Sequence, residues 1–402
     1  MTRNALEGVK ILEYCNMISG PYCTKLMADM GAEVIKIEHP GEGDLARKKG
    51  PFPGNIAHPE KSGLFLYLNT SKFGITLDPA TEDGKEIFYK LVKDVDILIE
   101  NKPTGEMETL GFGYDTLKQI NPGLIMTAIK SFGKSGPYKN YKAYSFNTGH
   151  ASGQSYVLPI PSLDLSRAPV KAGGNLSDYD PGLVTVVAVM AALFHKRISG
   201  RGQYIEISKQ EALLSMQRVE SVTYANGAES VSRQGNPFGI VRCKDGYVNI
   251  ITPQERQWEA FVKLLGNPEW AQEEAFKKRA SRVQMQNGIR LKRNVEEWAM
   301  KYTREEIVKM GQEMRVPVSS VNTAEDVVNS EQMMERQFFV PMEHPAVGKL
   351  DKFPSKPFKF HKTPWQLQRP APLLGQHNKE IFCERLGIDQ QTLAKLKENG
   401  VV

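Results

Sequence analysis

The chain is predicted to be an α/β protein whose larger part contains a parallel, Rossmann-like sheet. Short apolar runs alternate with amphipathic stretches over the first 130 residues, which is the order of strands joined by crossover helices. The runs are continuous in Val, Ile and Leu, as is typical of strands covered on both faces. The length of 402 residues is sufficient for two or three compact units.

The expected elements of this larger part follow in chain order. Strands are predicted at residues 9–14, 34–37, 97–100 and 124–129, and a helix at residues 22–30. Residues 138–177 are irregular and rich in proline and glycine, which indicates long loops crossing an active site.

Regular structure is expected to resume near Pro181. An apolar helix is predicted from Pro181 to Ile198, ending at Gly200. Residues 204–208 alternate as a strand does, and residues 209–227 are predicted to form a long connecting helix.

A second, smaller α+β unit is predicted to begin near Gly235. Residues 240–243 and 247–251 flank Lys244-Asp245-Gly246, which is a hairpin turn signal. Proline recurs after Pro317, as in a segment that returns to the first unit. The predicted organisation is a large domain (1–210), a linker helix (211–230), a small α+β domain (231–320) and a returning C-terminal segment (321–402).

Composition narrows the expected partners and location. The net charge of +6 is spread along the chain, which suits a small polyanion rather than nucleic acid. The four cysteines, at positions 15, 23, 243 and 383, form no metal or disulfide pattern and suggest the cytoplasm. The strongest apolar run, residues 184–194, is about half of what a bilayer span needs, so no membrane association is expected.

The sequence lacks the motifs of several common classes of enzyme. The turn from Asn16 to Pro21 follows the first strand, and Glu38 ends the next one, as in proteins that bind a dinucleotide. The dinucleotide motif G-x-G-x-x-G needs three glycines, but Gly20 is the only glycine of this turn. A helix beginning near Pro21 could still receive a phosphate. Seven isolated histidines and the lack of a G-x-S-x-G elbow predict neither a metal site nor a serine hydrolase.

Two aspartates, Asp178 and Asp180, precede the predicted apolar helix. Either could cap the helix by accepting a hydrogen bond from a free backbone amide, which is the commonest role for aspartate there. Either could also carry chemistry. The residues alone leave both interpretations open.

A series of motifs over almost the whole length resembles the family III CoA-transferases. This family includes formyl-CoA, carnitine-type and bile-acid transferases and, more distantly, α-methylacyl-CoA racemases. The matching segments are GVKILE (8–13), GP (20–21), GAEVIKIE (31–38), DILIEN (96–101), GFGYD (111–115), DYDPG (178–182), GRGQ (200–203) and APLLGQH (371–377).

The resemblance implies that Asp178 is a covalent nucleophile, since the family's aspartate lies four residues before a glycine that matches Gly182. The implied reaction moves CoA from an acyl-CoA to a carboxylic acid through an aspartyl mixed anhydride and an aspartyl-CoA thioester. Asp180 matches no catalytic position. No permanently bound cofactor is expected, because coenzyme A enters as part of a substrate.

The resemblance also implies CoA-binding positions. Phe73 and Thr109 depart from the residues that family members often have at these positions. The resemblance therefore does not say which residues contact the phosphates of CoA. The implied residues are Met17, Ile18, Ser19, His39, Arg47, Lys72, Asn101, Lys102 and Lys130.

The acid-binding pocket is expected to include Tyr144, Ser145 and His150. Racemases have a histidine where this chain has Tyr144, which disfavours α-proton transfer.

Formyl-CoA transferase folds a glycine-rich flap over its aspartate. No such flap is recognised at residues 228–240, so oxalate and formate are not expected as substrates. The family implies an interlocked homodimer. A racemase-like enzyme and a non-catalytic CoA-binding subunit remain the alternatives.

Overall fold

The computed structural model describes the chain apart from residues 1–3, 163, 217, 228–232 and 234–237. Contacts within the chain divide it into two compact units. The first unit contains residues 1–152, 173–217 and 332–402, and the second contains residues 153–172 and 218–331.

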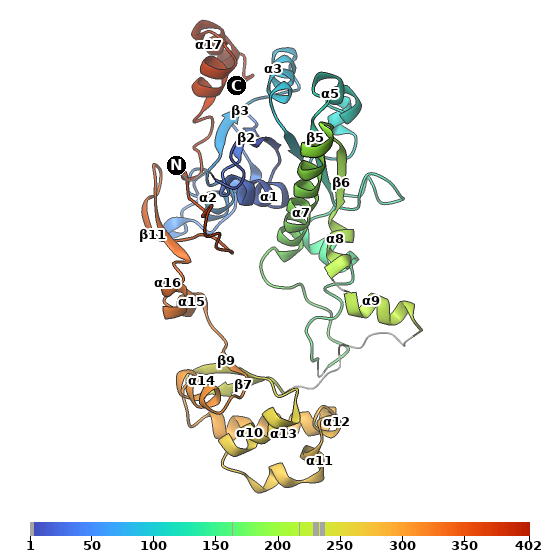
Figure 1. The fold of residues 1–402 in the computed structure, drawn as a ribbon, viewed down its shortest axis with the longest axis vertical. Coiled ribbons are helices and arrows are strands. Elements are labelled where there is room, and N and C mark those ends of the chain that lie inside the picture. Colours follow the sequence, from blue (N-terminus) through green and yellow to red (C-terminus); the bar gives the residue numbers. More distant parts are fainter. Residues whose placement is uncertain (1–3, 163, 217, 228–232, 234–237) are drawn as a thin grey trace. The chain divides into compact units, whose positions relative to one another are not determined.

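A six-stranded parallel sheet forms the centre of the first unit (Figure 1). The strand order is β3-β2-β1-β4-β5-β6, so consecutive strands build outwards on both sides of a switch between β1 and β4. The prediction of an α/β fold with a parallel sheet is therefore confirmed. The strands are β1 (Lys10–Tyr14), β2 (Glu33–Glu38), β3 (Phe73–Thr76), β4 (Ile97–Glu100), β5 (Ile125–Lys130) and β6 (Tyr204–Ser208).

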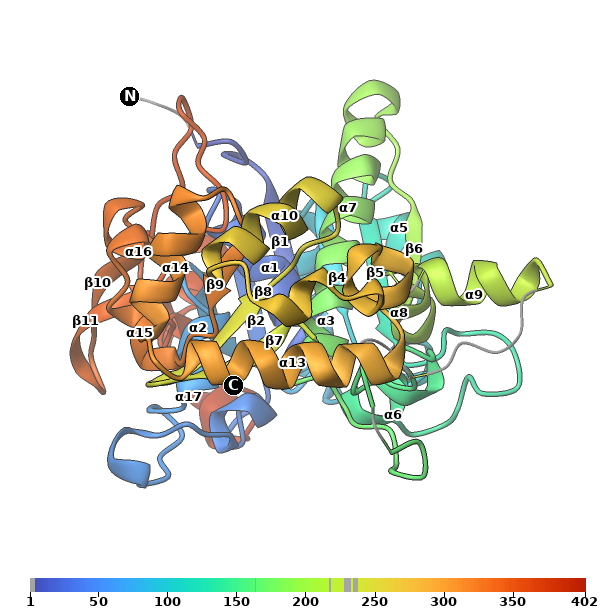
Figure 2. The same ribbon diagram turned by 90° about the horizontal axis from the view of Figure 1, so that it is seen from below.

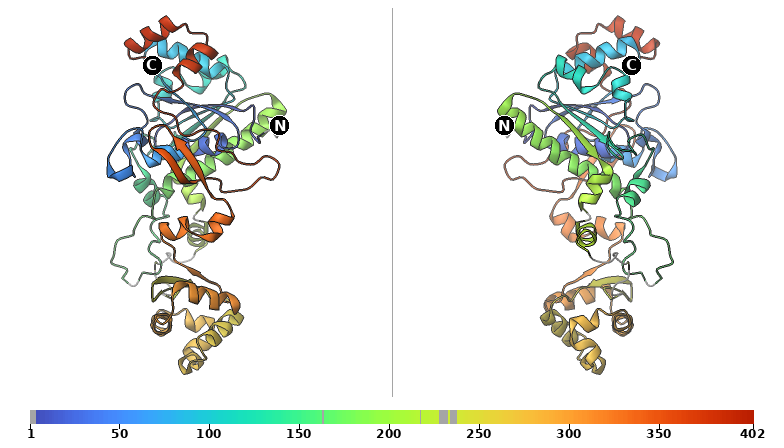
Figure 3. Two further views of the ribbon diagram at one scale, coloured as in Figure 1. Left: turned by 90° about the vertical axis from the view of Figure 1, so that its left-hand side faces the viewer. Right: turned by 90° about the vertical axis from the view of Figure 1, so that its right-hand side faces the viewer.

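Helices cover both faces of this sheet, which explains why the strands are apolar throughout. Side chains of α3 and α5 share a buried cluster with Leu12 and Leu98, whereas those of α1 and α7 share another with Ile11 and Ile97. Figure 3 shows the two layers of helices on either side of the sheet. The helices are α1 (Ser19–Ala28), α2 (Gly63–Leu68), α3 (Glu82–Lys93), α4 (Glu106–Thr109), α5 (Tyr114–Ile120), α6 (Ser145–Ala151), α7 (Leu176–Ser199) and α8 (Lys209–Met216), with 3-10 turns η1 (Leu45–Lys48) and η2 (Pro53–Asn55).

Helix α7 begins at Leu176, five residues before the predicted start at Pro181. Its N-cap residue is Asn175, so the interpretation of Asp178 or Asp180 as the cap is wrong. Proline favours the first turn of a helix because it has no N–H to donate. That preference placed the predicted boundary too late, and Asp178 lies inside the first turn.

The C-terminal part of the first unit runs along the edge strand β3. The amide of Gly74 donates to Nδ1 of His377 at 3.0 Å, and the amide of Ser71 donates to the carbonyl of Arg369 at 3.0 Å. A Cβ on Gly74 would lie 2.6 Å from the ring of Pro372, so only glycine permits this approach. The edge of the sheet is thereby covered. This part contains α16 (Glu331–Glu335), β10 (Phe339–His344), β11 (Gly348–Pro354), a π-helix η4 (Lys379–Arg385) and α17 (Gln390–Glu398).

The second unit is a small α+β structure with its own core. Three antiparallel strands lie in the order β7-β8-β9, and α13 and α14 contact them (Figure 2). The predicted hairpin at Lys244-Asp245-Gly246 joins β7 to β8. Its elements are α9 (Arg218–Ala225), β7 (Ile240–Cys243), β8 (Gly246–Ile250), α10 (Glu255–Leu264), η3 (Glu269–Gln272), α11 (Glu274–Lys277), α12 (Arg279–Arg282), α13 (Met285–Ala299), α14 (Arg304–Glu313), β9 (Val318–Ser320) and α15 (Ala324–Val328).

Candidate active site at Asp178

Asp178 is held in the first turn of α7 by close packing against α1. Gly182 lies one helical turn further on, where a Cβ would be 2.8 Å from the carbonyl oxygen of Ser19. Tyr179 contacts Tyr22 of α1 edge to face, with ring centroids 4.8 Å apart. A glycine at position 182 therefore lets the start of α7 approach the start of α1 closely, which gives the motif Asp178-x-x-x-Gly182 a physical meaning.

The Asp178 carboxylate forms an ion pair with Lys209. The Nζ–Oδ1 distance is 2.7 Å, and the side chains of Lys209 and Asp178 are only 16% and 12% exposed. Lys209 is the first residue of α8, directly after β6. An ion pair so shielded from water is stronger than one on the surface. Lys209 is not among the residues predicted from the sequence, and no local motif marks it, since its partner is 31 residues away.

Helix α6 brings the predicted acid-binding residues to the same region. It contacts both α7 and α8, and Gln210 donates from Nε2 to the carbonyl of Ala151 at 2.8 Å. In the described part of the chain, Ser145 Oγ and His150 Nε2 are buried without a hydrogen-bond partner. Buried polar atoms normally have partners, so these two atoms are candidates for contacts with a ligand. Tyr144, by contrast, is 67% exposed.

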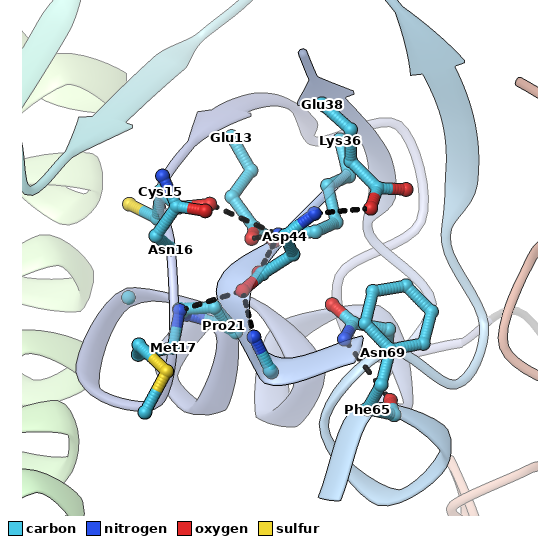
Figure 4. A network of polar contacts seen from close by, with 12 residues as sticks. Glu13, Cys15, Asn16, Met17, Pro21, Lys36, Glu38, Asp44, Phe65 and Asn69 are labelled. Carbon is cyan, nitrogen blue, oxygen red and sulfur yellow. Dashed lines mark hydrogen bonds and ion pairs between the residues drawn. The ribbon is translucent and has the colours of Figure 1, made fainter. Parts of the chain in front are cut away.

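The turn after β1 has an unusual backbone, which is held by Asp44 from the start of η1 and by Asn101, the residue after β4. Figure 4 shows the contacts of Asp44 with this turn. Met17 has a φ of 69°, and its amide donates to Oδ1 of Asp44 at 2.8 Å. Asn101, at the end of β4, accepts from the amide of Asn16 at 2.9 Å and donates to its carbonyl at 2.7 Å. Positive φ is strained for methionine, so these bonds keep the turn in one shape.

The next residues of this turn enter α1. Ile18 and Ser19 are both buried, and Ser19 Oγ has no hydrogen-bond partner among the described residues. They lie where β1 and β4 meet at their carboxyl ends. In open α/β sheets such a switch point is where ligands bind.

Lys102 and Lys130 gather around Glu100 at the end of β4. Lys130 Nζ donates to both oxygens of Glu100 at 2.8 Å and to the carbonyl of Lys102 at 2.5 Å. Lys102 Nζ lies 3.6 Å from the centre of the Tyr14 ring, a cation–π contact. Burial lowers the pKa of Lys102, and burial raises the pKa of Glu100 against the effect of Lys130.

Lys72 is wholly buried in an ion-pair network beneath the turn. Its Nζ lies 2.8 Å from Glu13, which also pairs with Lys36 at 2.7 Å, and Lys36 pairs with Asp44 at 2.7 Å. Burial lowers the pKa of Lys72 to about 8, against the raising effect of Glu13. Two carboxylates and two ammonium groups thus balance each other without any ligand.

The remaining predicted CoA-binding residues differ in exposure. Arg47 is buried, with two bonds to Glu38 at 2.7 and 2.8 Å and one to Glu60 at 2.6 Å. His39 is 56% exposed, and its Nε2 lies 3.8 Å from Asp78. His39 is therefore open to a ligand, whereas Arg47 and Lys72 have internal partners. Phosphate binding by these residues stays a prediction.

The structure thus collects the predicted residues into two groups of the first unit. One group lies on the contacting helices α6, α7 and α8 and includes Asp178, Ser145, His150 and the unpredicted Lys209. The other surrounds the turn after β1. Among the described residues, no group of three or more His, Cys, Asp or Glu side chains could hold a metal ion.

Comparison with known proteins identifies the family. A family model described as CoA-transferase family III matches residues 6–378. The chain belongs to that family. The resemblance seen in the sequence is confirmed, and the protein is a CoA-transferase.

Similar relatives of this CoA-transferase align over almost their whole length. A formyl-CoA:oxalate CoA-transferase of Rhodopseudomonas palustris (strain BisA53) is 31% identical, with 99% of this chain and 97% of that protein covered. A succinyl-CoA:mesaconate CoA-transferase of Haloarcula marismortui is 29% identical, with 96% and 98% covered. The crystal structure of a CAIB/BAIF family protein from Brucella suis superposes with a TM-score of 0.83 at 29% identity, covering 95% of this chain and 100% of that one.

These relatives act on different acids, so the family alone does not name the acid of this CoA-transferase. The expectation that oxalate and formate are not substrates depends on residues 228–240. Most of that segment lies outside the described residues. The expectation stays a prediction.

Proposed function

We propose that this CoA-transferase moves CoA from an acyl-CoA to a small carboxylic acid through covalent intermediates on Asp178. The observation that carries the proposal is a carboxylate 12% exposed, fixed in the first turn of α7 and paired with Lys209 at 2.7 Å. Shielding from water is essential for this chemistry, because an acylated aspartate would otherwise hydrolyse. The pair also compensates the carboxylate charge before substrate arrives.

The proposed reaction begins with attack of the Asp178 carboxylate on the thioester carbonyl. A bond forms between Oδ and the acyl carbon, the carbon–sulfur bond breaks, and CoA leaves as a thiolate. The thiolate then attacks Cγ of Asp178, forms an aspartyl-CoA thioester and expels the first acid as a carboxylate. No water or cofactor enters these steps, so the acyl-transfer potential of the thioester is retained.

The second acid reverses the sequence. Its carboxylate attacks Cγ of Asp178, which forms a new anhydride and releases the CoA thiolate. The thiolate attacks the acyl carbon of the new acid and leaves Asp178 as a free carboxylate. Donor and acceptor therefore use the same site in turn.

The CoA nucleotide is proposed to bind at the turn after β1. Support comes from the position of Met17, Ile18 and Ser19 at the carboxyl ends of β1 and β4, and from the two bonds by which Asn101 holds the turn. The start of α1 also offers free backbone amides to an anion. His39 follows β2, Lys102 follows β4 and Lys130 ends β5, so all three lie at the carboxyl ends of strands of the same parallel sheet.

Trapping with hydroxylamine tests the covalent route. Wild-type protein incubated with an acyl-CoA and hydroxylamine is expected to gain a hydroxamate on the peptide containing Asp178, because hydroxylamine attacks an acylated carboxylate. Peptide mass spectrometry maps the adduct. A panel of acyl-CoA donors covers the unknown acid. Turnover without any adduct, or α-carbon deuterium exchange without an acceptor acid, would argue against the proposal and for the racemase-like alternative.

We also propose that two copies of the chain associate in an interlinked dimer. Support comes from the outward face of α7, where Leu183, Val187, Met190, Phe194 and Ile198 are all exposed at helical spacing. By length and composition alone, α7 is the one helix among the described residues that could cross a membrane. Its other face packs on α1 and β5 and carries Asp178, which favours a protein partner over lipid. A continuous apolar stripe of this kind marks an interaction surface.

If the dimer forms through this apolar stripe, a charged residue placed in the stripe should lower the molecular mass of the protein in solution. Wild type is expected to run at twice the 45.0 kDa of one chain in size-exclusion chromatography with light scattering. Phe194→Asp should lower that mass, since a carboxylate would have to be buried without a partner. Ile56, which is 74% exposed on a loop, provides the control Ile56→Asp with no expected change. A wild type with the mass of one chain would contradict the proposal.

A further inference from the structure

The partner of Lys209 changes charge during the proposed reaction. In the free enzyme Lys209 Nζ lies 2.7 Å from Asp178 Oδ1. In the described part of the chain it forms no other ion pair within 4.0 Å. Both covalent forms of Asp178, the anhydride and the thioester, are neutral. The ammonium group therefore loses its counter-charge whenever Asp178 is acylated.

An uncompensated ammonium at this position would be costly. The Lys209 side chain is only 16% exposed, so water replaces the lost carboxylate incompletely. Lys209 is also fixed in place, because it opens α8 directly after β6, and the neighbouring Gln210 joins α8 to α6. The backbone of Lys209 is therefore held close to Asp178 whatever the charge of that residue.

We propose that Lys209 binds the reacting carboxylate of the acid substrates, an inference that rests on the proposed covalent route through Asp178. When the first acid is expelled from Asp178, its carboxylate takes the place of the aspartate charge beside Nζ. When the second acid enters, one of its oxygens accepts a hydrogen bond from Lys209. The other oxygen attacks Cγ of Asp178, which lies one bond from the Oδ1 position that Lys209 contacts.

Charge is conserved throughout this exchange. Asp178 carries the negative charge in the free enzyme, the leaving acid carries it after thioester formation, and the entering acid carries it before the second anhydride forms. In the anhydride states the charge is on the CoA thiolate. Lys209 therefore selects carboxylates over water and other neutral nucleophiles at the moment when the acylated aspartate is reactive.

The test compares charged and neutral nucleophiles on the same intermediate. Lys209→Met keeps the length of the side chain and removes its charge. With this variant, kcat/KM for the acceptor acid is expected to fall about 30-fold or more, as for loss of a charge-assisted hydrogen bond. Trapping of acylated Asp178 by neutral hydroxylamine, in the absence of acceptor, should change little. Lys209→Arg should restore part of the acceptor activity.

A matched control lies on α7, the helix that carries Asp178. Lys196, near the other end of α7, pairs with Asp96 at 2.6 Å and is 18% exposed. It is about 27 Å along the helix from Asp178. Lys196→Met should leave both reactions unchanged, and its stability shows how loss of a mostly buried lysine affects folding.

The outcomes separate this inference from the proposed function. Absence of the hydroxylamine adduct in wild type would defeat the covalent route itself. If wild type is trapped but Lys209→Met loses trapping and acceptor activity equally, Lys209 positions Asp178 and does not bind the acid. If Lys209→Met keeps its acceptor activity, the inference is also wrong.

Discussion

Asp178→Asn is expected to abolish CoA transfer, with kcat lowered by about 10⁴-fold or more, as for loss of a covalent nucleophile. The amide has nearly the same shape as the carboxylate and can still accept from Lys209 Nζ. Its oxygen is not a nucleophile toward a thioester, so neither the anhydride nor the aspartyl-CoA thioester forms. Steady-state transfer rates and the hydroxylamine adduct should disappear together.

Asp180→Asn is the control for this prediction. Asp180 lies two residues further along α7 and is predicted from the resemblance to have no catalytic role. The control variant should retain transfer activity, and both variants should have similar circular dichroism spectra. A substantial transfer rate in Asp178→Asn would show that another group accepts the acyl chain.

Glu13→Gln is expected to lower the free energy of unfolding by about 3–5 kcal/mol at neutral pH, the effect of breaking a buried ion pair. Glu13 is fully buried and contacts both Lys36 and Lys72 at 2.7 and 2.8 Å. Among the described residues, a neutral amide leaves Lys72 with no ion-pair partner and Lys36 with Asp44 alone. Urea unfolding followed by circular dichroism measures the loss, and hydrogen exchange in β1 and β2 assigns it to the first unit.

The pH dependence of this difference provides a second check. Burial by itself would raise the pKa of Glu13, but Lys36 and Lys72 lower it from 4.5 to about 2. A depressed carboxyl pKa stabilises the fold above the unfolded value, and this contribution disappears as pH falls from 4.5 toward about 2. Wild type and Glu13→Gln should therefore converge in acid. Glu86→Gln, on the exposed side of α3, should match wild type throughout.

Elements that depend on local pattern were predicted well. The apolar runs of β1, β2, β4 and β5 each lie within a residue or two of the predicted ranges, because strands buried on both faces need continuous apolar side chains. The hairpin of the second unit followed from its turn residues. The start of α7 was predicted five residues too late, since Pro181 lies inside the helix.

Ordered motifs were also sufficient for the family, and the resemblance they carry is the source of the prediction that Asp178 rather than Asp180 is catalytic. Gly182 explains why the spacing matters, as it permits the contact with Ser19 that only the folded chain makes visible. The roles proposed for Ser145 and His150 came from resemblance. The structure adds that each has a buried polar atom without a partner in the described chain.

The sequence by itself determined the parallel α/β fold and the family, because both are encoded in local hydrophobic pattern and in short motifs. Tertiary structure alone decided the pairing of charges. Lys72 meets Glu13 across 59 positions of the chain, and Lys209 meets Asp178 across 31. A lysine looks the same in sequence whether it is solvated or buried, and only the folded backbone brings its counter-charge within reach.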